Sequence, residues 1–195
     1  MVRTGRPRAF DTDKALERAL EVFWSRGYGR TSVQDLVDAL GVQRGSLYAT
    51  FGDKHTLFLK AVELYARRNR ARLEEILHSG PVLPVLRRLL LEPATLTGAE
   101  GSRGCLLGNT TAELAPGDEA ARAFAAAAYD EFITVVAGAL RRAQAAGEIT
   151  TGATPEAQAE LLLVLFQGTA LISRASGRDR LAGGVDAALD ALRAP

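Results

Sequence analysis

The segment from Arg30 to Lys54 constrains the fold most, because it encodes two short helices joined at a single glycine. In its first half, apolar residues recur every three or four positions, which is the spacing of one buried helical face. They are Val33, Leu36, Val37 and Leu40. Gly41 follows, and glycine readily takes the left-handed conformation that ends a helix. The pattern predicts an amphipathic helix that stops at Gly41.

Residues just before this helix can cap its free backbone N–H groups. Ser32 with Asp35, and Thr31 with Gln34, both have the capping-box spacing of three positions. Either pair predicts that the helix begins near residue 33.

The second helix differs from the first, because its exposed face is polar and contains no acid. Val42, Leu47 and Phe51 supply its buried side. Small and hydrogen-bonding groups occupy the other side, as a helix in the major groove of DNA requires. These are Gln43, Arg44, Gly45, Ser46, Tyr48 and Thr50. We interpret the segment as a helix-turn-helix, which makes DNA binding the leading function.

A spaced signature runs through this segment, close to T-x-x-x-[IL]-[AV]-x-x-x-G-V-x-x-G-x-[LIV]-Y-x-x-F-x-x-K-x-x-L. The chain matches it at Val37, Gly41, Val42, Gly45, Leu47, Tyr48, Phe51, Lys54 and Leu57, and upstream at Ala19, Phe23, Gly27 and Tyr28. On these residues, about the first third of the chain, it resembles the TetR family of transcriptional regulators. The resemblance implies an all-α fold of about nine helices, with a helix-turn-helix head and a helical ligand-binding and dimerisation body.

The resemblance also implies which side chains meet DNA. Positions that face bases are occupied by Gln43, Arg44, Gly45 and Thr50. Positions that hold phosphates are occupied by Thr31, Ser32, Ser46, Tyr48 and Lys54. Arg44 also has a physical basis for its role, because a guanidinium fork can bind O6 and N7 of guanine together. The alternatives are a core aromatic with its hydroxyl exposed for Tyr48 and a plain surface lysine for Lys54.

Positive charge is concentrated at the start of the chain. The net charge is only +1, but residues 1–55 hold nine Lys/Arg and seven Asp/Glu, a balance of +2. Arg3, Arg6 and Arg8 all precede the first acid, Asp11. Because local clusters of this kind attract phosphate, we expect the arm to contact DNA; a solvated tail is the alternative.

The remainder of the chain is expected to be helical. We expect further helices at about 12–26, 53–77, 81–92, 105–114, 118–146, 155–176 and 179–192. The helix from residue 53 would span about 37 Å, long enough to connect two domains. We place a helix-turn-helix DNA-binding domain at 1–55 and a helical ligand-binding and dimerisation domain at 56–195.

The single cysteine, Cys105, lies in G-C-L-L-G-N-T-T-A-E, from Gly104 to Glu113. This element is similar to one in a TetR subgroup, in some of whose members the cysteine reacts with electrophiles or oxidants. A thiol at a helix N-terminus can be reactive, whereas a lone cysteine on an apolar helix is more often a small buried hydrophobe. We therefore expect packing, with redox or electrophile sensing through Cys105 as an alternative function.

The body is expected to bind a small-molecule inducer of unknown identity. Asn109 and Glu113 share a helical face with Cys105, where they either line a pocket or satisfy buried backbone groups. The other candidates are mostly apolar, as small-molecule sites tend to be, and could equally be core. They are Tyr65, Leu86, Leu90, Tyr129, Phe132, Phe166 and Gln167. In this hypothesis the inducer favours one pose of the 53–77 helix, and the repressor leaves its operator.

The last two expected helices carry more apolar surface than a monomer needs. Leu161–Phe166 is apolar around a full turn, so it must be covered on every side. The resemblance implies a homodimer through these two helices; a monomer core is the alternative. Two recognition helices then require a nearly palindromic double-stranded operator, with half-sites about 34–36 Å apart.

Other classes of protein have little support. His55 and His78 are far apart and have no metal-ligand spacing, and no phosphate-binding glycine motif or nucleophilic serine elbow occurs. We expect no enzyme activity, metal or cofactor. The longest apolar run is too short to cross a bilayer, and the arginine-rich opening lacks a signal-peptide core, so we expect a cytoplasmic protein without a membrane partner. A non-catalytic helical interaction module is a further alternative.

Overall fold

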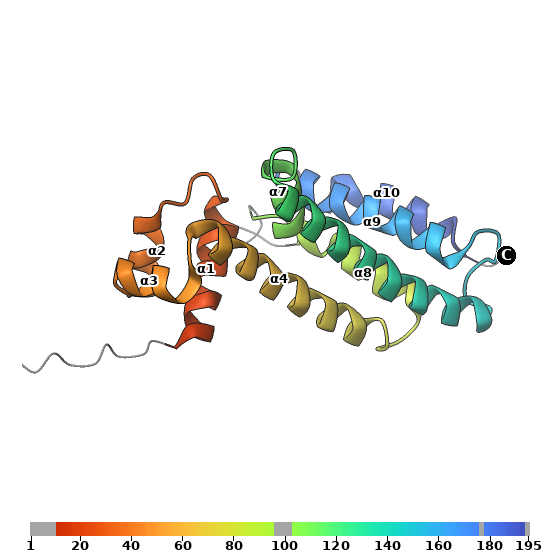
Figure 1. The fold of residues 1–195 in the computed structure, drawn as a ribbon. Helices are drawn as coiled ribbons and strands as arrows, with labels where there is room; N and C mark the ends of the chain where they lie inside the picture. Colours follow the sequence, from red (N-terminus) through yellow and green to blue (C-terminus); the bar gives the residue numbers. More distant parts are fainter. Residues whose placement is uncertain (1–10, 96–102, 176–177, 194–195) are drawn as a thin grey trace, which may run out of the picture. The chain divides into compact units, whose positions relative to one another are not determined.

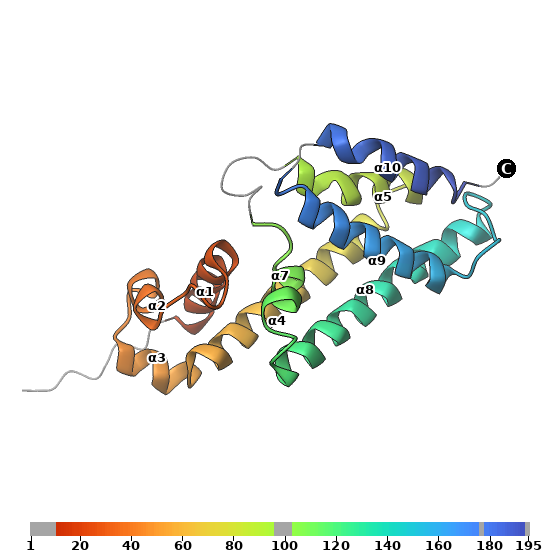
Figure 2. The ribbon, with the colours of Figure 1, turned by 90° about the horizontal axis from the view of Figure 1, so that it is seen from above.

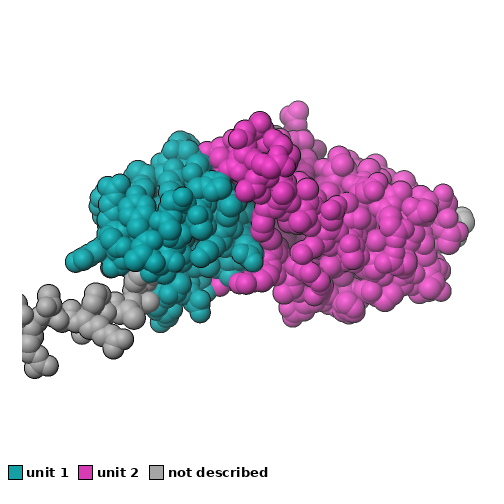
Figure 3. Space-filling model, in the orientation of Figure 1, with its two compact units in different colours: residues 1–64 teal, residues 65–195 magenta. Residues whose placement is uncertain are grey.

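The computed structural model describes residues 11–95, 103–175 and 178–193. Within these residues the fold consists of nine α-helices and one short 3-10 helix, and the only β pairing is an isolated bridge between Ile149 and Arg193 (Figure 1). The predicted all-α fold is confirmed. The chain divides into two compact units, residues 1–64 and residues 65–195 (Figure 3).

The first unit contains three short helices and the beginning of a fourth. They are α1 at Thr12–Arg26, α2 at Val33–Leu40, α3 at Arg44–Phe51 and α4, which runs from Lys54 to Ile76 and continues into the second unit. The division between the units falls after Leu64, within α4.

Local hydrogen bonds determine where α2 begins and ends. Ser32 Oγ accepts a hydrogen bond from Asp35 N at 3.1 Å, and Asp35 Oδ2 accepts one from Ser32 N at 2.8 Å. The capping box predicted for this pair is thus confirmed. At the other end, Gly41 has the left-handed φ of 67° and ψ of 34° that its position requires.

Thr31 does not form the second predicted capping box. Its side chain is buried, and its hydroxyl donates a hydrogen bond to Gly27 O at 2.7 Å. The residue that caps α2 is Ser32, one position later, because its extended backbone leaves its hydroxyl near the free N–H groups.

The core of the first unit is built largely from aromatic rings and leucines close together in sequence. Phe23 of α1 meets Phe58 of α4 edge to face, with 5.1 Å between ring centroids. Leu36, Leu47 and Phe51, from α2 and α3, are at most 3% exposed. Burying these side chains fixes the buried faces of α2 and α3, so their other faces must point to solvent.

The second unit is formed by the remainder of α4 and the later helices. These are α5 at Val82–Leu91, a 3-10 helix at Glu92–Ala94, α7 at Leu106–Glu113, α8 at Glu119–Ala145, α9 at Pro155–Ile172 and α10 at Arg178–Asp190. The long helices α8 and α9 lie side by side, and α5 contacts α8, α9 and α10 (Figure 2).

One predicted boundary in this unit is wrong. The helix expected to continue to about residue 176 ends at Ile172. Ser173 follows as its C-cap, and the Ser173 hydroxyl donates to Ala170 O at 3.2 Å. Serine hydroxyls that bond the local backbone favour helix ends in this way.

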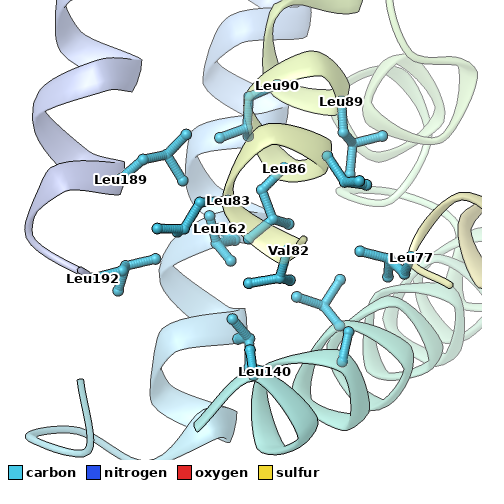
Figure 4. Close-up of a cluster of buried hydrophobic side chains, with 14 of the residues drawn as sticks. Leu77, Val82, Leu83, Leu86, Leu89, Leu90, Leu140, Leu162, Leu189 and Leu192 are labelled. Atoms are coloured by element: carbon cyan, nitrogen blue, oxygen red, sulfur yellow. The ribbon is translucent and has the colours of Figure 1, made fainter. Parts of the chain in front are cut away.

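Leucines from distant parts of the chain form the core of the second unit (Figure 4). Leu86 of α5, Leu140 of α8 and Leu162 of α9 are each at most 1% exposed. Arg87 and Asp186 close the edge of this core with two hydrogen bonds of 2.6 and 3.0 Å, joining α5 to α10.

One helix, α8, is long and apolar enough to cross a membrane by length and composition alone. A single helix of this kind also occurs in the cores of proteins in water. In the second unit α8 packs along α9 and α7, and Asp130, Glu131 and Arg141 are exposed on it.

Candidate nucleic-acid interface and interior polar cluster

Helix α3 has one buried face and one polar face open to solvent. Leu47 is 0% exposed and Phe51 is 3% exposed. The side chains predicted to face bases lie on the other side and are all exposed: Gln43, Arg44, Gly45 and Thr50. No acid occurs in α3, so nothing within the helix repels a phosphate backbone.

Arg44 and Tyr48 lie one turn apart on this open face. Arg44 Nη2 donates a hydrogen bond to Tyr48 Oη at 3.3 Å, and Arg44 Cζ lies 5.6 Å from the centroid of the tyrosine ring. Tyr48 is 37% exposed and is not among the buried core residues. The pair presents a guanidinium group beside a phenol, both accessible from solvent.

The residues predicted to hold phosphates lie in different environments. Ser32 is exposed and Ser46 is half-buried. Lys54, the first residue of α4, places its Nζ 4.1 Å from the centroid of the Tyr28 ring, so it is not a plain surface lysine. Thr31 is 1% exposed and its hydroxyl donates to Gly27 O, so its side chain does not belong to the open surface around α3. The predicted arm residues Arg3, Arg6 and Arg8 lie outside the described residues.

The Asp35 carboxylate stays ionised and links Ser32, the N-cap of α2, to Arg26 of α1. The hydrogen bonds from the Ser32 side chain and then from its backbone lower the pKa of the Asp35 carboxyl to about 2. Arg26 of α1 adds an ion pair to the same carboxylate at 2.5 Å. Because this network joins α1 to the start of α2, it orients the helix that precedes α3.

In the second unit, the thiol of Cys105 receives two weak hydrogen bonds. Tyr65 Oη, from α4, lies 3.7 Å from Cys105 Sγ, and Gln167 Nε2, from α9, lies 3.8 Å from it. Gly108 completes this group, which we call the Cys105 cluster. A Cβ atom at Gly108 would lie only 2.5 Å from Gln167 Oε1, so glycine is what allows the amide to approach α7.

A second polar contact lies on the α8 side. Thr111 Oγ1 and Tyr129 Oη are 2.8 Å apart. Burial raises the pKa of the Tyr65 hydroxyl, and the neighbouring Cys105 thiol raises it further. Burial also raises the pKa of Tyr129, although the hydrogen bond with Thr111 opposes this. Both phenols are therefore neutral at physiological pH, and the polar groups around Cys105 are uncharged donors and acceptors.

Four of the predicted pocket residues belong to the hydrophobic core. Leu86 and Leu90 are 1% exposed within the leucine cluster. Phe132 and Phe166 pack against the cluster and stack on each other with 5.8 Å between ring centroids. Their burial in the core accounts for their apolar character without a ligand.

Asn109 and Glu113, the two polar residues predicted beside Cys105 on α7, have different surroundings. Asn109 Nδ2 donates to Arg103 O at 2.8 Å, and Asn109 Oδ1 accepts from Arg174 Nη1 at 3.2 Å. Asn109 thus joins the segment before α7 to the segment after α9, through one backbone carbonyl and one guanidinium group. Glu113 is exposed at the end of α7.

Sequence reasoning missed Gly108 and Thr111, which form contacts around the predicted residues. A signal for Gly108 was available, because glycine inside a helix costs about 1 kcal/mol relative to alanine and so indicates a close approach. Thr111 gave no such signal, since threonine in a short helix is common on any face.

A separate open groove of about 600 Å³ lies between α4 and α5. Apolar side chains, arginines, one acid and one threonine line it: Arg72, Ile76, Pro84, Arg87, Arg88, Leu89, Leu91, Glu92 and Thr95. None of the residues predicted for the ligand pocket is among them. In the described part of the chain, no group of three or more His, Cys, Asp or Glu side chains is placed to hold a metal ion.

A helix-turn-helix with an acid-free open face, joined to a larger helical unit, is the arrangement of a DNA-binding regulator. Comparison with known proteins agrees. Residues 15–61 match the model of bacterial regulatory proteins of the TetR family, and residues 92–189 match the tetracycline repressor-like C-terminal domain. The chain belongs to the TetR family of transcriptional regulators.

Individual relatives support the same assignment. The transcriptional repressor ComR of Escherichia coli is 33% identical over 175 residues, which cover 87% of this chain and 82% of ComR. The uncharacterised regulator YezE of Bacillus subtilis is 42% identical over 123 residues, 62% of this chain and 63% of YezE. A cysteine mutant of the TetR-family regulator CifR, complexed with 26-base-pair operator DNA, is 33% identical, covers 96% of this chain and all of CifR, and has a TM-score of 0.82.

Proposed function

We propose that this protein is a ligand-responsive repressor that binds operator DNA through α3 and is released by a small-molecule inducer. The observation that carries the proposal is that α3 has one buried apolar face and one exposed polar face. Burial of Leu47 and Phe51 leaves Gln43, Arg44 and Thr50 open, which is the arrangement that a major-groove helix needs. ComR is named a repressor, and CifR is complexed with operator DNA, which supports the proposal.

Binding to duplex DNA from the region upstream of the protein's own gene tests this function. Fluorescence anisotropy at several salt concentrations should show affinity that falls as salt rises, because phosphate contacts release counterions. A scrambled duplex of equal length should bind more weakly. Equal affinity for both duplexes, or no binding to either, contradicts the proposal.

Residues around α3 are proposed to hold phosphates and so fix the register of the protein on DNA. On the described surface these are Ser32, Ser46, Tyr48 and Lys54. For Arg3, Arg6 and Arg8 the support is the charge of the N-terminal sequence alone.

A homodimer through α9 and α10 is proposed because α9 leaves an apolar stripe uncovered. Leu161, Val164, Leu171 and Ile172 are 46%, 68%, 65% and 45% exposed, and they recur at helical spacing. Gly168 lies within this stripe and would allow close approach of a second backbone. A twin subunit is the occupant expected, since two copies of α3 then read a nearly palindromic operator.

Val164→Glu tests the dimer. A charge at the most exposed position of the stripe should shift sedimentation toward the monomer and weaken operator binding. Ala126→Glu, on the exposed face of α8, is the matched control and should sediment as the wild-type protein does. A wild-type protein that sediments as a monomer at micromolar concentration contradicts the dimer.

The inducer is proposed to bind in the second unit, next to the Cys105 cluster. Tyr65, Gln167 and Tyr129 offer uncharged hydrogen-bonding groups there among apolar side chains, the mixture typical of small-molecule sites.

The proposed partner, operator DNA, also implies where the protein acts and what kind of protein it is. We propose a cytoplasmic location and a regulatory rather than a catalytic role.

A thiol-sensing repressor is the second candidate, favoured by the contacts of Cys105. Its sulfur touches α4 through Tyr65 and α9 through Gln167, so a group added to the sulfur would displace both. Labelling the native protein with a maleimide and then measuring operator binding tests this. Release of DNA by labelled wild type, but not by treated Cys105→Ser, supports sensing; full labelling without release excludes it.

A further inference from the structure

Lys54 is the first residue of α4, and its ammonium lies against the face of an aromatic ring. The 4.1 Å between Lys54 Nζ and the Tyr28 centroid is well within the range, about 6 Å, over which a ring attracts a cation. Tyr28 belongs to the loop between α1 and α2, far from Lys54 in sequence. No carboxylate among the described residues forms an ion pair with Lys54, so the ring is the ammonium's attractive partner there.

The first turn of a helix is an unfavourable place for a cation. Free N–H groups give this end of α4 a partial positive charge. Asp53 precedes the lysine and stays ionised, because a hydrogen bond from Thr56 N at 2.7 Å lowers its pKa, but among the described residues its carboxylate forms no ion pair with Lys54. This end of α4 therefore favours a further anion nearby, which a phosphate approaching from outside would provide.

The Tyr28 ring is itself held by the core of the first unit. It meets Phe58 at 5.0 Å between centroids with an interplanar angle of 62°, and it stacks on Phe23 at 6.4 Å. Both phenylalanines are at most 1% exposed. His55 lies edge to face against the same ring at 6.1 Å. Because its neighbours are fixed, the tyrosine ring provides a fixed surface for the lysine.

We propose that Tyr28 is a positioning residue for DNA binding, which holds Lys54 in place before DNA arrives. The inference rests on the proposed function, in which Lys54 contacts a phosphate. A free lysine side chain loses rotamer freedom when it binds, and a side chain ordered beforehand loses less. The ring covers one side of the ammonium, which has three N–H donors, so donors remain for a phosphate.

A double-mutant cycle tests the proposal on duplex DNA from the protein's own upstream region. Tyr28→Leu should weaken binding about twofold to fivefold, the loss expected for an exposed cation–ring contact. In a Lys54→Met background the same change should have no further effect. Tyr28→Phe keeps the ring face and should retain wild-type affinity. Equal weakening by Tyr28→Leu in both backgrounds would show a purely structural role and overturn the proposal.

Pentafluorophenylalanine in place of Tyr28 separates electrostatics from packing. It keeps an aromatic ring of similar shape but removes electron density from the ring face, so it should weaken binding as Tyr28→Leu does. Wild-type affinity with this residue overturns the proposal even if Tyr28→Leu fails to fold.

The salt dependence shows whether Lys54 contacts a phosphate. Lys54→Met should lower the slope of log affinity against log salt by about 0.9. Lys60→Met is the matched control, since Lys60 also lies on α4 and its Nζ is 5.9 Å from the Phe51 ring; its slope should stay closer to wild type. An unchanged slope in Lys54→Met overturns the positioning role while DNA binding stands. Absence of salt-dependent binding by the wild-type protein instead removes the proposed function.

Discussion

The two units of this protein build their buried regions in different ways. In residues 1–64, the core combines rings and leucines from four neighbouring helices, and the candidate interface lies on the outside of α3. In residues 65–195, leucines from α5, α8, α9 and α10 meet across long sequence distances, and the polar Cys105 cluster lies inside. In the first unit, the candidate functional residues therefore lie on an exposed face that is set by residue spacing within one helix. In the second unit, they lie between helices that are distant in sequence.

The largest expected effect tests whether the two cores are separate. Leu86→Ala in the second unit should destabilise that unit by about 2–5 kcal/mol, because a fully buried leucine leaves a cavity. Trp24, the one tryptophan of the chain, lies on α1 and reports on the first unit. In denaturant, circular dichroism should show an earlier loss of helix while the Trp24 fluorescence transition stays in place.

Leu47→Ala is the paired variant, since Leu47 is 0% exposed in the first unit. It should move the Trp24 transition and leave most of the helix signal unchanged. If either variant shifts the circular dichroism and Trp24 fluorescence transitions equally, the two units unfold together. That result would contradict the view that their cores are separately stable.

A smaller effect is expected at the open face of α3. Arg44→Ala should weaken operator binding by about 1–3 kcal/mol and relax the preference at one base pair, because it removes a bidentate contact to guanine. Competition with a set of single-base operator variants measures both quantities. Thr12→Ala, exposed at the start of α1, serves as the control. Unchanged affinity and preference would remove Arg44 from base recognition.

Gly108→Ala should change stability by no more than about 1 kcal/mol, because two effects oppose each other. The new methyl group meets the end of the flexible Gln167 side chain, whereas alanine favours the helix. The displaced amide should uncover the thiol, so Cys105 should react faster with a maleimide. Gly117→Ala, where a Cβ would meet nothing within 4 Å, is the matched control. Equal labelling rates in all three proteins would show that Gln167 does not cover the sulfur.

The smallest expected effect is on the stability of the folded state at low pH. Hydrogen bonds from Ser32 lower the pKa of Asp35 from 3.8 to about 2, so this carboxylate stabilises the folded state above pH 4. The stabilisation is lost as pH falls from about 4 through about 2. Acid titration of Asp35→Asn, followed by Trp24 fluorescence, should show a smaller decrease over that window than the wild-type protein. A parallel decrease in both proteins would exclude Asp35 as a source of the pH dependence.

Much of the first unit could be predicted because its signals are local. Ser32 with Asp35 marked the start of α2, Gly41 marked its end, and the apolar spacing separated Leu47 and Phe51 from the residues now exposed. The error at Thr31 is also informative. Thr31 lies one position before the true N-cap and has the same three-residue spacing to a possible capping partner. Only its hydrogen bond to Gly27 O shows that its side chain is buried and stabilises the preceding loop instead.

In the second unit, sequence identified the helices but not the roles of most side chains. Leu86 and Leu90 could not be distinguished from pocket walls, because an apolar residue has the same pattern in a core and in a binding site. Asn109 showed a polar group on the face of Cys105, but its partners, Arg103 and Arg174, lie in two separate segments, before α7 and after α9.

The amino-acid sequence by itself determined the helical fold, the family and the polar face of α3, because these depend on residue spacing within single helices. The tertiary structure decided which groups surround Cys105 and which ring holds Lys54. Those contacts join Tyr65 to Cys105 and Tyr28 to Lys54 across dozens of intervening residues. Distances between such residues are set by how whole helices pack, and no local pattern encodes them.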